Sequence, residues 1–88
     1  MNNADTVPPL RETDLLEAFK GDHQFAITLA RGLEILRCFT ASRPVLSNKQ
    51  LSALTGLPKP TITRFTYTLA RLGYLQIDAR SGKFLLGS

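Results

Sequence analysis

Six residues between positions 51 and 65 have the types and spacing that a helix-turn-helix requires. Ser52 is the small residue needed where two helices touch, and Gly56, four residues later, can adopt φ > 0 in the tight turn at no steric cost. Ile62, six residues further on, is the apolar residue that roots the second helix in the core. Three other core positions are filled by Leu51, Leu57 and Phe65. The chemistry open to such a unit is recognition of base edges and phosphates in duplex DNA.

The exposed face of the second helix of this motif is expected to carry no acidic residue. When its apolar residues face inward, the opposite face presents Lys59, Thr61, Thr63, Arg64, Tyr67 and Thr68. Arginine can pair bidentately with guanine, threonine can bond a base or pack on the thymine methyl, and lysine and tyrosine can hold phosphates. A merely solvated face, the alternative, is usually rich in glutamate–lysine pairs, and this one has none. The face therefore favours contact with a major groove.

The first helix of the motif opens with Ser47, Lys49 and Gln50, which are also candidates for DNA contact. The amides and the positive dipole end of a helix N-terminus can receive a phosphate. Ser47 and Gln50 are equally explained as a capping box, which needs no ligand.

Basic residues elsewhere have two open interpretations. Arg80 and Lys83 flank a turn between two expected strands, where they could reach a minor groove or the DNA backbone, or serve only solubility. Three further arginines could attract phosphates diffusely or merely coat a helix, namely Arg31, Arg37 and Arg43.

Charge is divided unevenly along the 88 residues. Residues 1–22 hold two basic and five acidic side chains, a balance of −3, whereas residues 23–88 hold nine basic and two acidic ones, a balance of +7. Together these give the formal net charge of +4. A strongly basic folded part favours a polyanionic partner.

Length and composition argue against several classes of protein. Eighty-eight residues allow one small domain with a thin core, without room for an enclosed active site. With no nucleophile–base pair or phosphate loop, an enzyme is not expected. One cysteine, Cys38, and one histidine, His23, cannot form a disulfide or a zinc site, so no cofactor is expected. No apolar run approaches the ~20 residues of a membrane span, and no secretory signal is visible, which favours the cytoplasm.

An N-terminal arm is expected over residues 1–22, ahead of a domain over residues 23–88. Residues 1–11 are polar, contain Pro8-Pro9 and show no period, which predicts disorder. Thr13 as N-cap and Gly21 as stop then predict a short helix, Asp14–Lys20.

Three apolar residues of this short helix need a partner, because a seven-residue helix is not stable alone in water: Leu15, Leu16 and Phe19. They could pack on the domain's own first helix or on the same element of a second subunit. The second option is favoured, because a two-fold dimer places two recognition helices one DNA turn apart.

Helical spacing of apolar residues predicts the first helix of the domain over residues 24–41, ended by Arg43-Pro44. Its apolar positions are Phe25, Leu29, Leu33, Leu36 and Phe39, with Arg31, Glu34 and Arg37 on the other face. Val45-Leu46 is an extended piece able to pair as a minimal strand. The helices of the motif (about 47–67) are expected at Asn48–Thr55 and Lys59–Leu72, the second with a buried stripe of Ile62, Phe65, Leu69 and Leu72.

A hairpin is expected to follow, with strands Tyr74–Asp78 and Lys83–Leu86 around a turn that contains Gly82. Leu75 and Ile77 should share one side of its first strand. The predicted fold is therefore mainly α, a winged helix-turn-helix with a three-helix core, a wing over about 74–86 and a short extra N-terminal helix.

From Phe25 onward the sequence resembles the N-terminal domain of the isocitrate lyase regulator (IclR) family of bacterial transcription factors. The residues that carry the resemblance are LARGLEILRCF, LSALTGLPKPTITRF, LARLGYL and SGKFLLG. The resemblance implies a homodimeric or tetrameric regulator that binds pseudo-palindromic operators in double-stranded DNA. It also implies a small-molecule effector, bound by a larger C-terminal domain that follows the wing in family members and is not part of this sequence. Ser52 stands where alanine is usual.

A different class of function is also open, since winged helices serve as protein-interaction modules without reading DNA. The acid-free recognition face and the balance of +7 over residues 23–88 favour DNA over this alternative.

Overall fold

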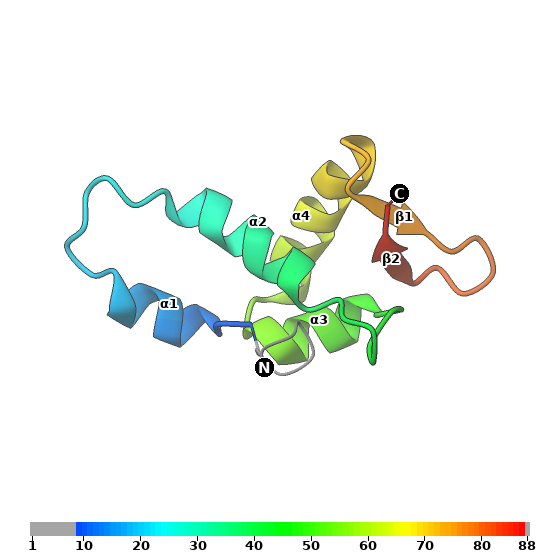
Figure 1. The fold of residues 1–88 in the computed structure, drawn as a ribbon, viewed down its shortest axis with the longest axis horizontal. Coiled ribbons are helices and arrows are strands. Elements are labelled where there is room, and N and C mark those ends of the chain that lie inside the picture. The colour runs from blue at the N-terminus through cyan, green and yellow to red at the C-terminus, as the bar shows by residue number, and fades with distance from the viewer. Residues whose placement is uncertain (1–8, 88) are drawn as a thin grey trace.

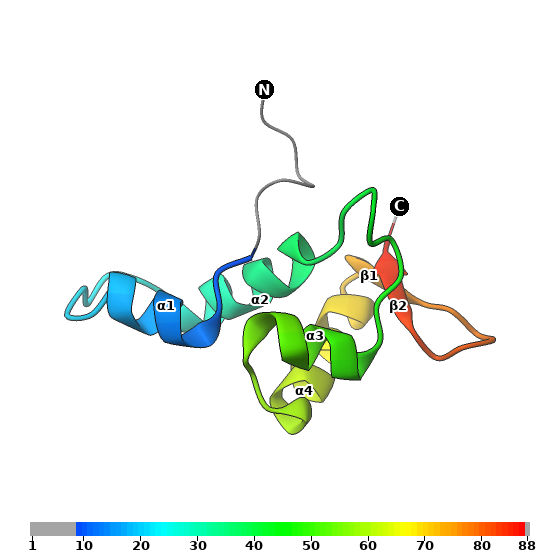
Figure 2. The ribbon, with the colours of Figure 1, turned by 90° about the horizontal axis from the view of Figure 1, so that it is seen from below.

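The computed structural model describes residues 9–87 as four helices and one two-stranded antiparallel sheet (Figure 1). The elements, in chain order, are α1 (Glu12–Ala18), α2 (Ile27–Arg37), α3 (Asn48–Thr55), α4 (Lys59–Arg71), β1 (Leu75–Ile77) and β2 (Phe84–Leu86). α1 and the hairpin of β1 and β2, the wing, lie at opposite ends of the molecule, with α2, α3 and α4 between them (Figures 1 and 2). The predicted winged helix-turn-helix is confirmed. Within these residues no helix has the length and apolar character needed to span a membrane.

The core lies where α2, α3 and α4 meet. Ile35, Leu51 and Ile62, one from each helix, are fully buried, and Leu57 and Leu75 close the cluster. These positions include the core residues that the helix-turn-helix spacing predicted, with Phe65 packed against them as a half-buried residue.

Cys38 belongs to the same buried cluster. Its thiol donates to the carbonyl of Glu34 at 3.3 Å, and burial raises its pKa to about 11. A thiol that stays protonated at neutral pH is a packing group rather than a nucleophile.

The helix-turn-helix has the local hydrogen bonds that its sequence predicted. The capping box is complete, because Gln50 N donates to Ser47 Oγ at 3.1 Å and Ser47 N donates to Gln50 Oε1 at 2.8 Å. Gly56 caps α3 in the left-handed region, with φ of +79°. The hydroxyl of Ser52 donates to the carbonyl of Leu57 at 2.6 Å, a bond across the turn that alanine could not make.

The wing is attached to the core by the extended piece that precedes α3. Leu46 exchanges two backbone hydrogen bonds with Phe84, of 2.9 and 2.8 Å, so the predicted minimal strand at Val45-Leu46 forms as a single bridge. Leu75 pairs with Leu86 and is buried, whereas Ile77 is 57% exposed. Of the two residues predicted to share one side of the first strand, only Leu75 is therefore buried. Ile77 is exposed because the wing extends beyond the helices that could cover it. Both strands are also shorter than predicted.

Gly87 closes the base of the wing. Its amide donates to the carbonyl of Tyr74 at 2.8 Å, and a Cβ at this position would lie 2.1 Å from the carbonyl oxygen of Gly73. A backbone oxygen cannot move aside as a flexible side chain does, so the close approach requires glycine. This contact gives a physical reason for the Leu-Gly that ends the wing.

α2 is shorter than the predicted helix over residues 24–41. The amides of Cys38 and Phe39 bond to carbonyls three residues back, which tightens the end of the helix. Thr40 and Arg43 then exchange backbone bonds of 3.2 and 3.0 Å in a turn. The helix therefore ends before Arg43-Pro44, and the proline is not what stops it.

The predicted division of α2 into an apolar buried face and a charged outer face is wrong in part. Leu29 and Leu33 are 63% and 52% exposed, whereas Glu34 is buried. The reason is that the segment before α1 docks on Glu34, whose Oε1 accepts from Leu10 N, and leaves the two leucines uncovered. Leu72, predicted within the buried stripe of α4, is likewise 66% exposed. The buried residues of α4 are Ile62, as predicted, and Thr66, which the stripe did not include.

The N-terminal segment is bound to the domain from Pro9 onward, which corrects the predicted disorder for residues 9–11. The rest of the stretch predicted to be disordered, residues 1–8, lies outside the described residues. Pro9 is buried, and Leu10 N donates to Glu34 Oε1 at 2.8 Å. α1 starts two residues earlier than predicted and Arg11 is its N-cap, so Thr13 lies within the helix and is not the cap.

Leu15 is buried within its own chain, and Glu12 forms an ion pair with Arg31 of α2. Leu15 therefore needs no second subunit to bury it, and α1 is tied to the domain's own first helix through Glu12. Leu16 and Phe19 remain 49% and 37% exposed, with the Phe19 ring stacked on that of Phe25 at 3.9 Å.

Candidate DNA interface

α4 presents most of the predicted recognition residues to solvent. Pro58 is its N-cap, and Pro60 lies in the first turn, where the missing amide has no intrahelical partner. Exposed side chains are those of Lys59, Thr63, Arg64, Tyr67 and Thr68, and Thr61 is half-buried. The helix contains no acidic residue, so the whole exposed face is neutral or positive.

The threonine hydroxyls on this face already donate to their own helix. Thr63 Oγ1 donates to the carbonyl of Lys59 at 3.0 Å and Thr68 Oγ1 to that of Arg64 at 3.0 Å. Each hydroxyl can still accept a bond, for example from a base amino group, and each methyl can pack on thymine. Their direct use as donors would require breaking a bond within the helix.

Arg64 differs from these threonines because it forms no hydrogen bond or ion pair with any of the described residues. Its five N–H donors are therefore all available to a ligand. A guanidinium in this state is suited to the paired acceptors on the major-groove edge of guanine.

Arg71 belongs to the same exposed surface and was missed in the sequence analysis. It lies seven residues after Arg64, which places both on one face of α4. Its guanidinium lies 6.0 Å from the centre of the Tyr67 ring, within the range of a cation–π contact. The helical spacing of Arg64, Tyr67 and Arg71 could have identified Arg71 as part of this surface from the sequence.

The start of α3 contributes less than predicted. Ser47 and Gln50 are both engaged in the capping box, which leaves Lys49 as the exposed residue with a free charge. Asn48, which the sequence analysis did not single out, donates from Nδ2 to Thr63 Oγ1 at 2.8 Å and so ties the start of α3 to α4.

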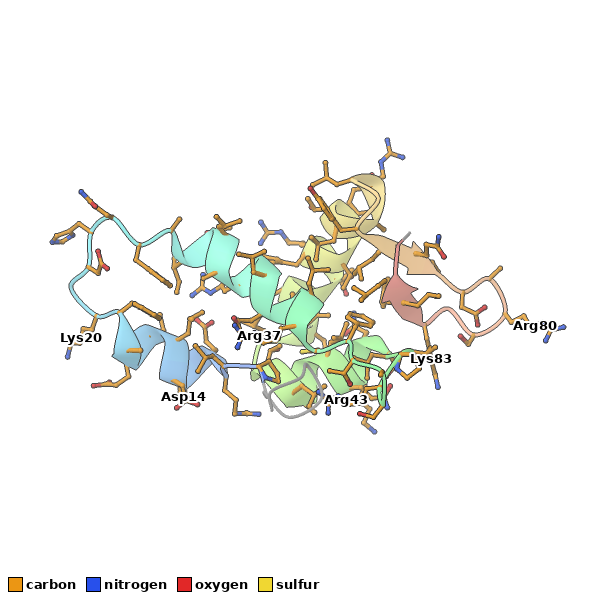
Figure 3. All side chains as sticks on the ribbon, in the orientation of Figure 1. Asp14, Lys20, Arg37, Arg43, Arg80 and Lys83 are labelled. Carbon is orange, nitrogen blue, oxygen red and sulfur yellow. The ribbon has the colours of Figure 1, made fainter. Side chains whose placement is uncertain are left out.

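The wing holds its two basic residues around an ordered turn. Asp78 accepts at Oδ2 from Ser81 Oγ at 2.6 Å and from Ser81 N at 3.2 Å, and these bonds lower the pKa of the Asp78 carboxyl. Arg80 points away from the body of the molecule at the tip of the wing, and Lys83 immediately precedes β2 (Figure 3). Both side chains are exposed.

The three other arginines considered as phosphate attractors have structural partners. Arg31 pairs with Glu12, Arg37 lies 3.6 Å from Glu34, and Arg43 Nε donates to the carbonyl of Cys38 at 3.2 Å. Their sites favour the interpretation that these residues stabilise the fold.

An open apolar groove of about 570 Å³ runs between α2 and α4. It is lined mainly by leucines of both helices and by aromatic residues, and its one charged lining residue is Arg64: Thr28, Leu29, Gly32, Leu33, Leu36, Arg64, Phe65, Thr68, Leu69, Leu72 and Tyr74. Three leucines that were predicted to be buried but are exposed line this groove: Leu29, Leu33 and Leu72.

Comparison with known proteins places this geometry in a family. The IclR helix-turn-helix domain matches residues 28–79. The chain is 56% identical over 61 residues to the HTH-type transcriptional regulator TsaQ1/TsaQ2 of Comamonas testosteroni, covering 69% of this chain and 22% of that protein. It is 36% identical over 70 residues to the Pca regulon regulatory protein of Pseudomonas putida, covering 80% of this chain and 24% of that protein.

The fold agrees with this assignment. The crystal structure of an IclR-family transcriptional regulator from Brucella abortus superposes with a TM-score of 0.76 at 53% identity, covering 80% of this chain and 26% of that one. The chain thus spans about a quarter of the length of these relatives. Sequence, fold and the exposed face of α4 agree, and the chain belongs to the IclR helix-turn-helix family.

Proposed function

We propose that this chain reads a specific sequence in double-stranded DNA, with α4 in the major groove, as the operator-binding part of a bacterial transcriptional regulator in the cytoplasm. The observation that carries the proposal is Arg64, a guanidinium with no partner among residues 9–87, at the centre of an acid-free helix face. Lys59, Tyr67 and Arg71 surround it with groups that can hold phosphates. Lys49 and the wing residues Arg80 and Lys83 would extend the contact along the backbone.

The experiment that tests this function is selection of bound duplexes from a random DNA pool, followed by titration of the recovered duplex at several salt concentrations. We expect the affinity to fall steeply with salt, with a slope of log K against log salt of about −0.9 per neutralised phosphate. Lys83→Ala should weaken binding to all sequences about equally and reduce that slope by about one phosphate. Lys20→Ala is the control, because Lys20 lies at the end of the molecule opposite the wing (Figure 3). Recovery of no preferred duplex would contradict the proposed function.

A homodimer on a pseudo-palindromic operator is part of the proposal, with a second copy seated on the α2–α4 groove. α1 is bound to its own chain through Leu15, whereas the groove has no cover among the described residues. Leu29 and Leu33 are exposed beside the groove of about 570 Å³. In a two-fold contact, these leucines of each copy can therefore enter the groove of the other copy. The contact would be confined to the leucines of the groove, so that Arg64, its one charged lining residue, stays open to DNA.

Paired substitutions distinguish the groove from α1 as the dimer contact. Leu33 of the groove and Leu16 of α1 are 52% and 49% exposed, so aspartate at either position perturbs the core to a similar, small extent. We expect the wild-type chain and Leu16→Asp to sediment as dimers, and Leu33→Asp to sediment as a folded monomer, with a melting temperature lowered only by the loss of association. Dissociation by Leu16→Asp alone would instead identify α1 as the contact.

A further inference from the structure

At the carboxyl end of α3, the helix and its turn leave the carbonyl of Ala53 without a backbone donor. The Gly56 amide donates to the carbonyl of Ser52 at 2.8 Å, but the next amide, that of Leu57, donates to Thr55 Oγ1 at 3.2 Å. The carbonyl of Ala53, which a continuing helix would bond through Leu57, therefore needs another donor. α3 has no basic residue in its last turn that could reach it.

Arg11 supplies that donor from 42 residues away. Its Nη1 donates to the carbonyl of Ala53 at 2.6 Å. A cation at this place also complements the negative end of the α3 dipole. The same guanidinium covers the turn, since a Cβ on Gly56 would lie 3.1 Å from Nη2 of Arg11.

The backbone of Arg11 is held in place on both sides. Leu10 N donates to Glu34 Oε1 at 2.8 Å, and Glu12 pairs with Arg31, so both neighbours of Arg11 are bound to α2. Arg11 itself is the N-cap of α1, and its carbonyl accepts from Leu15 N at 2.9 Å. Arg11 therefore connects two parts of the domain, the outer face of α2 and the turn between α3 and α4.

We propose that Arg11 is a positioning residue for DNA recognition, which fixes the direction of α4 by bracing the helix-turn-helix turn against α2. The turn sets the angle between α3 and α4, and base readout requires side chains placed to within a fraction of an ångström. Arg11 lies outside the segment that matches the family, residues 28–79. The inference rests on the proposed DNA-binding function.

The test compares Arg11→Gln, Arg11→Lys and Lys20→Gln in the 88-residue chain, using the duplex recovered from the random pool by the wild-type protein and a scrambled duplex. Lysine can still donate to the Ala53 carbonyl, and Lys20→Gln removes the same charge far from the turn. We expect Arg11→Gln to bind the recovered duplex roughly three- to tenfold more weakly, the scrambled duplex about as before, and both with an unchanged salt slope. Arg11→Lys should recover most of the affinity, and Lys20→Gln should match the wild type.

A reduction of the salt slope by about one phosphate in Arg11→Gln would overturn the inference, because it would make Arg11 a direct phosphate contact. Wild-type binding by Arg11→Gln would overturn it as well. Hydrogen exchange of the Gly56 amide in the free protein gives a second measurement, in which Arg11→Gln should speed exchange and Arg11→Lys should restore protection. If the wild-type chain bound no duplex, the proposed function would fail separately, and unchanged exchange at Gly56 would still refute the brace.

Discussion

Replacement of Gly56 by valine is expected to destabilise the domain by about 1–3 kcal/mol, a large part of the stability of so small a core. Gly56 has φ of +79°, a conformation in which a β-branched side chain clashes with its own backbone. The structure adds a second cost, because the new Cβ would lie 3.1 Å from the guanidinium of Arg11. The variant should therefore lose both the turn conformation and the contact that braces it.

Gly21 offers a matched control for this experiment. Its φ is +82°, but a Cβ there would meet nothing within 4 Å. Gly21→Val should show the cost of backbone strain alone, and the excess cost of Gly56→Val reports the contact with Arg11. Chemical denaturation of both variants, alone and combined with Arg11→Ala, measures the two contributions. An unchanged denaturation midpoint for Gly56→Val would show that the turn does not need glycine.

Replacement of Arg64 by alanine is expected to cost about 1–3 kcal/mol in binding to the recovered duplex and to relax the preference at one or two base positions. Arg64 is exposed and forms no bond with the described residues, so its removal should leave the free energy of unfolding unchanged. The effect of the substitution should therefore appear in recognition rather than in folding.

Binding of Arg64→Ala to the recovered and scrambled duplexes separates base readout from charge. Lys83→Ala is the comparison, since a phosphate contact should lose affinity equally on both duplexes. If Arg64→Ala also lost the same affinity on both, Arg64 would be a phosphate contact and another residue of α4 would read the base.

The sequence by itself determined the parts of this protein that depend on neighbours within a few residues. The bounds of α3, the capping box of Ser47 and Gln50 and the left-handed turn at Gly56 all follow from contacts over five residues or fewer. The core positions Leu51 and Ile62 follow from helical period for the same reason. These local interactions were sufficient to predict the fold and the helix that carries the candidate interface.

Only the tertiary structure decided what covers each helix. An apolar stripe shows which side of a helix can be buried, but other parts of the chain supply the cover. The segment before α1 docks on Glu34 through Leu10 and leaves Leu29 and Leu33 exposed. The same holds for polar groups, since Thr63 is bonded by Asn48 of another helix. The bond from Arg11 to the Ala53 carbonyl joins residues 42 positions apart, and no spacing rule relates them. Contacts at this range depend on how α1 docks, which is a property of the assembled helices.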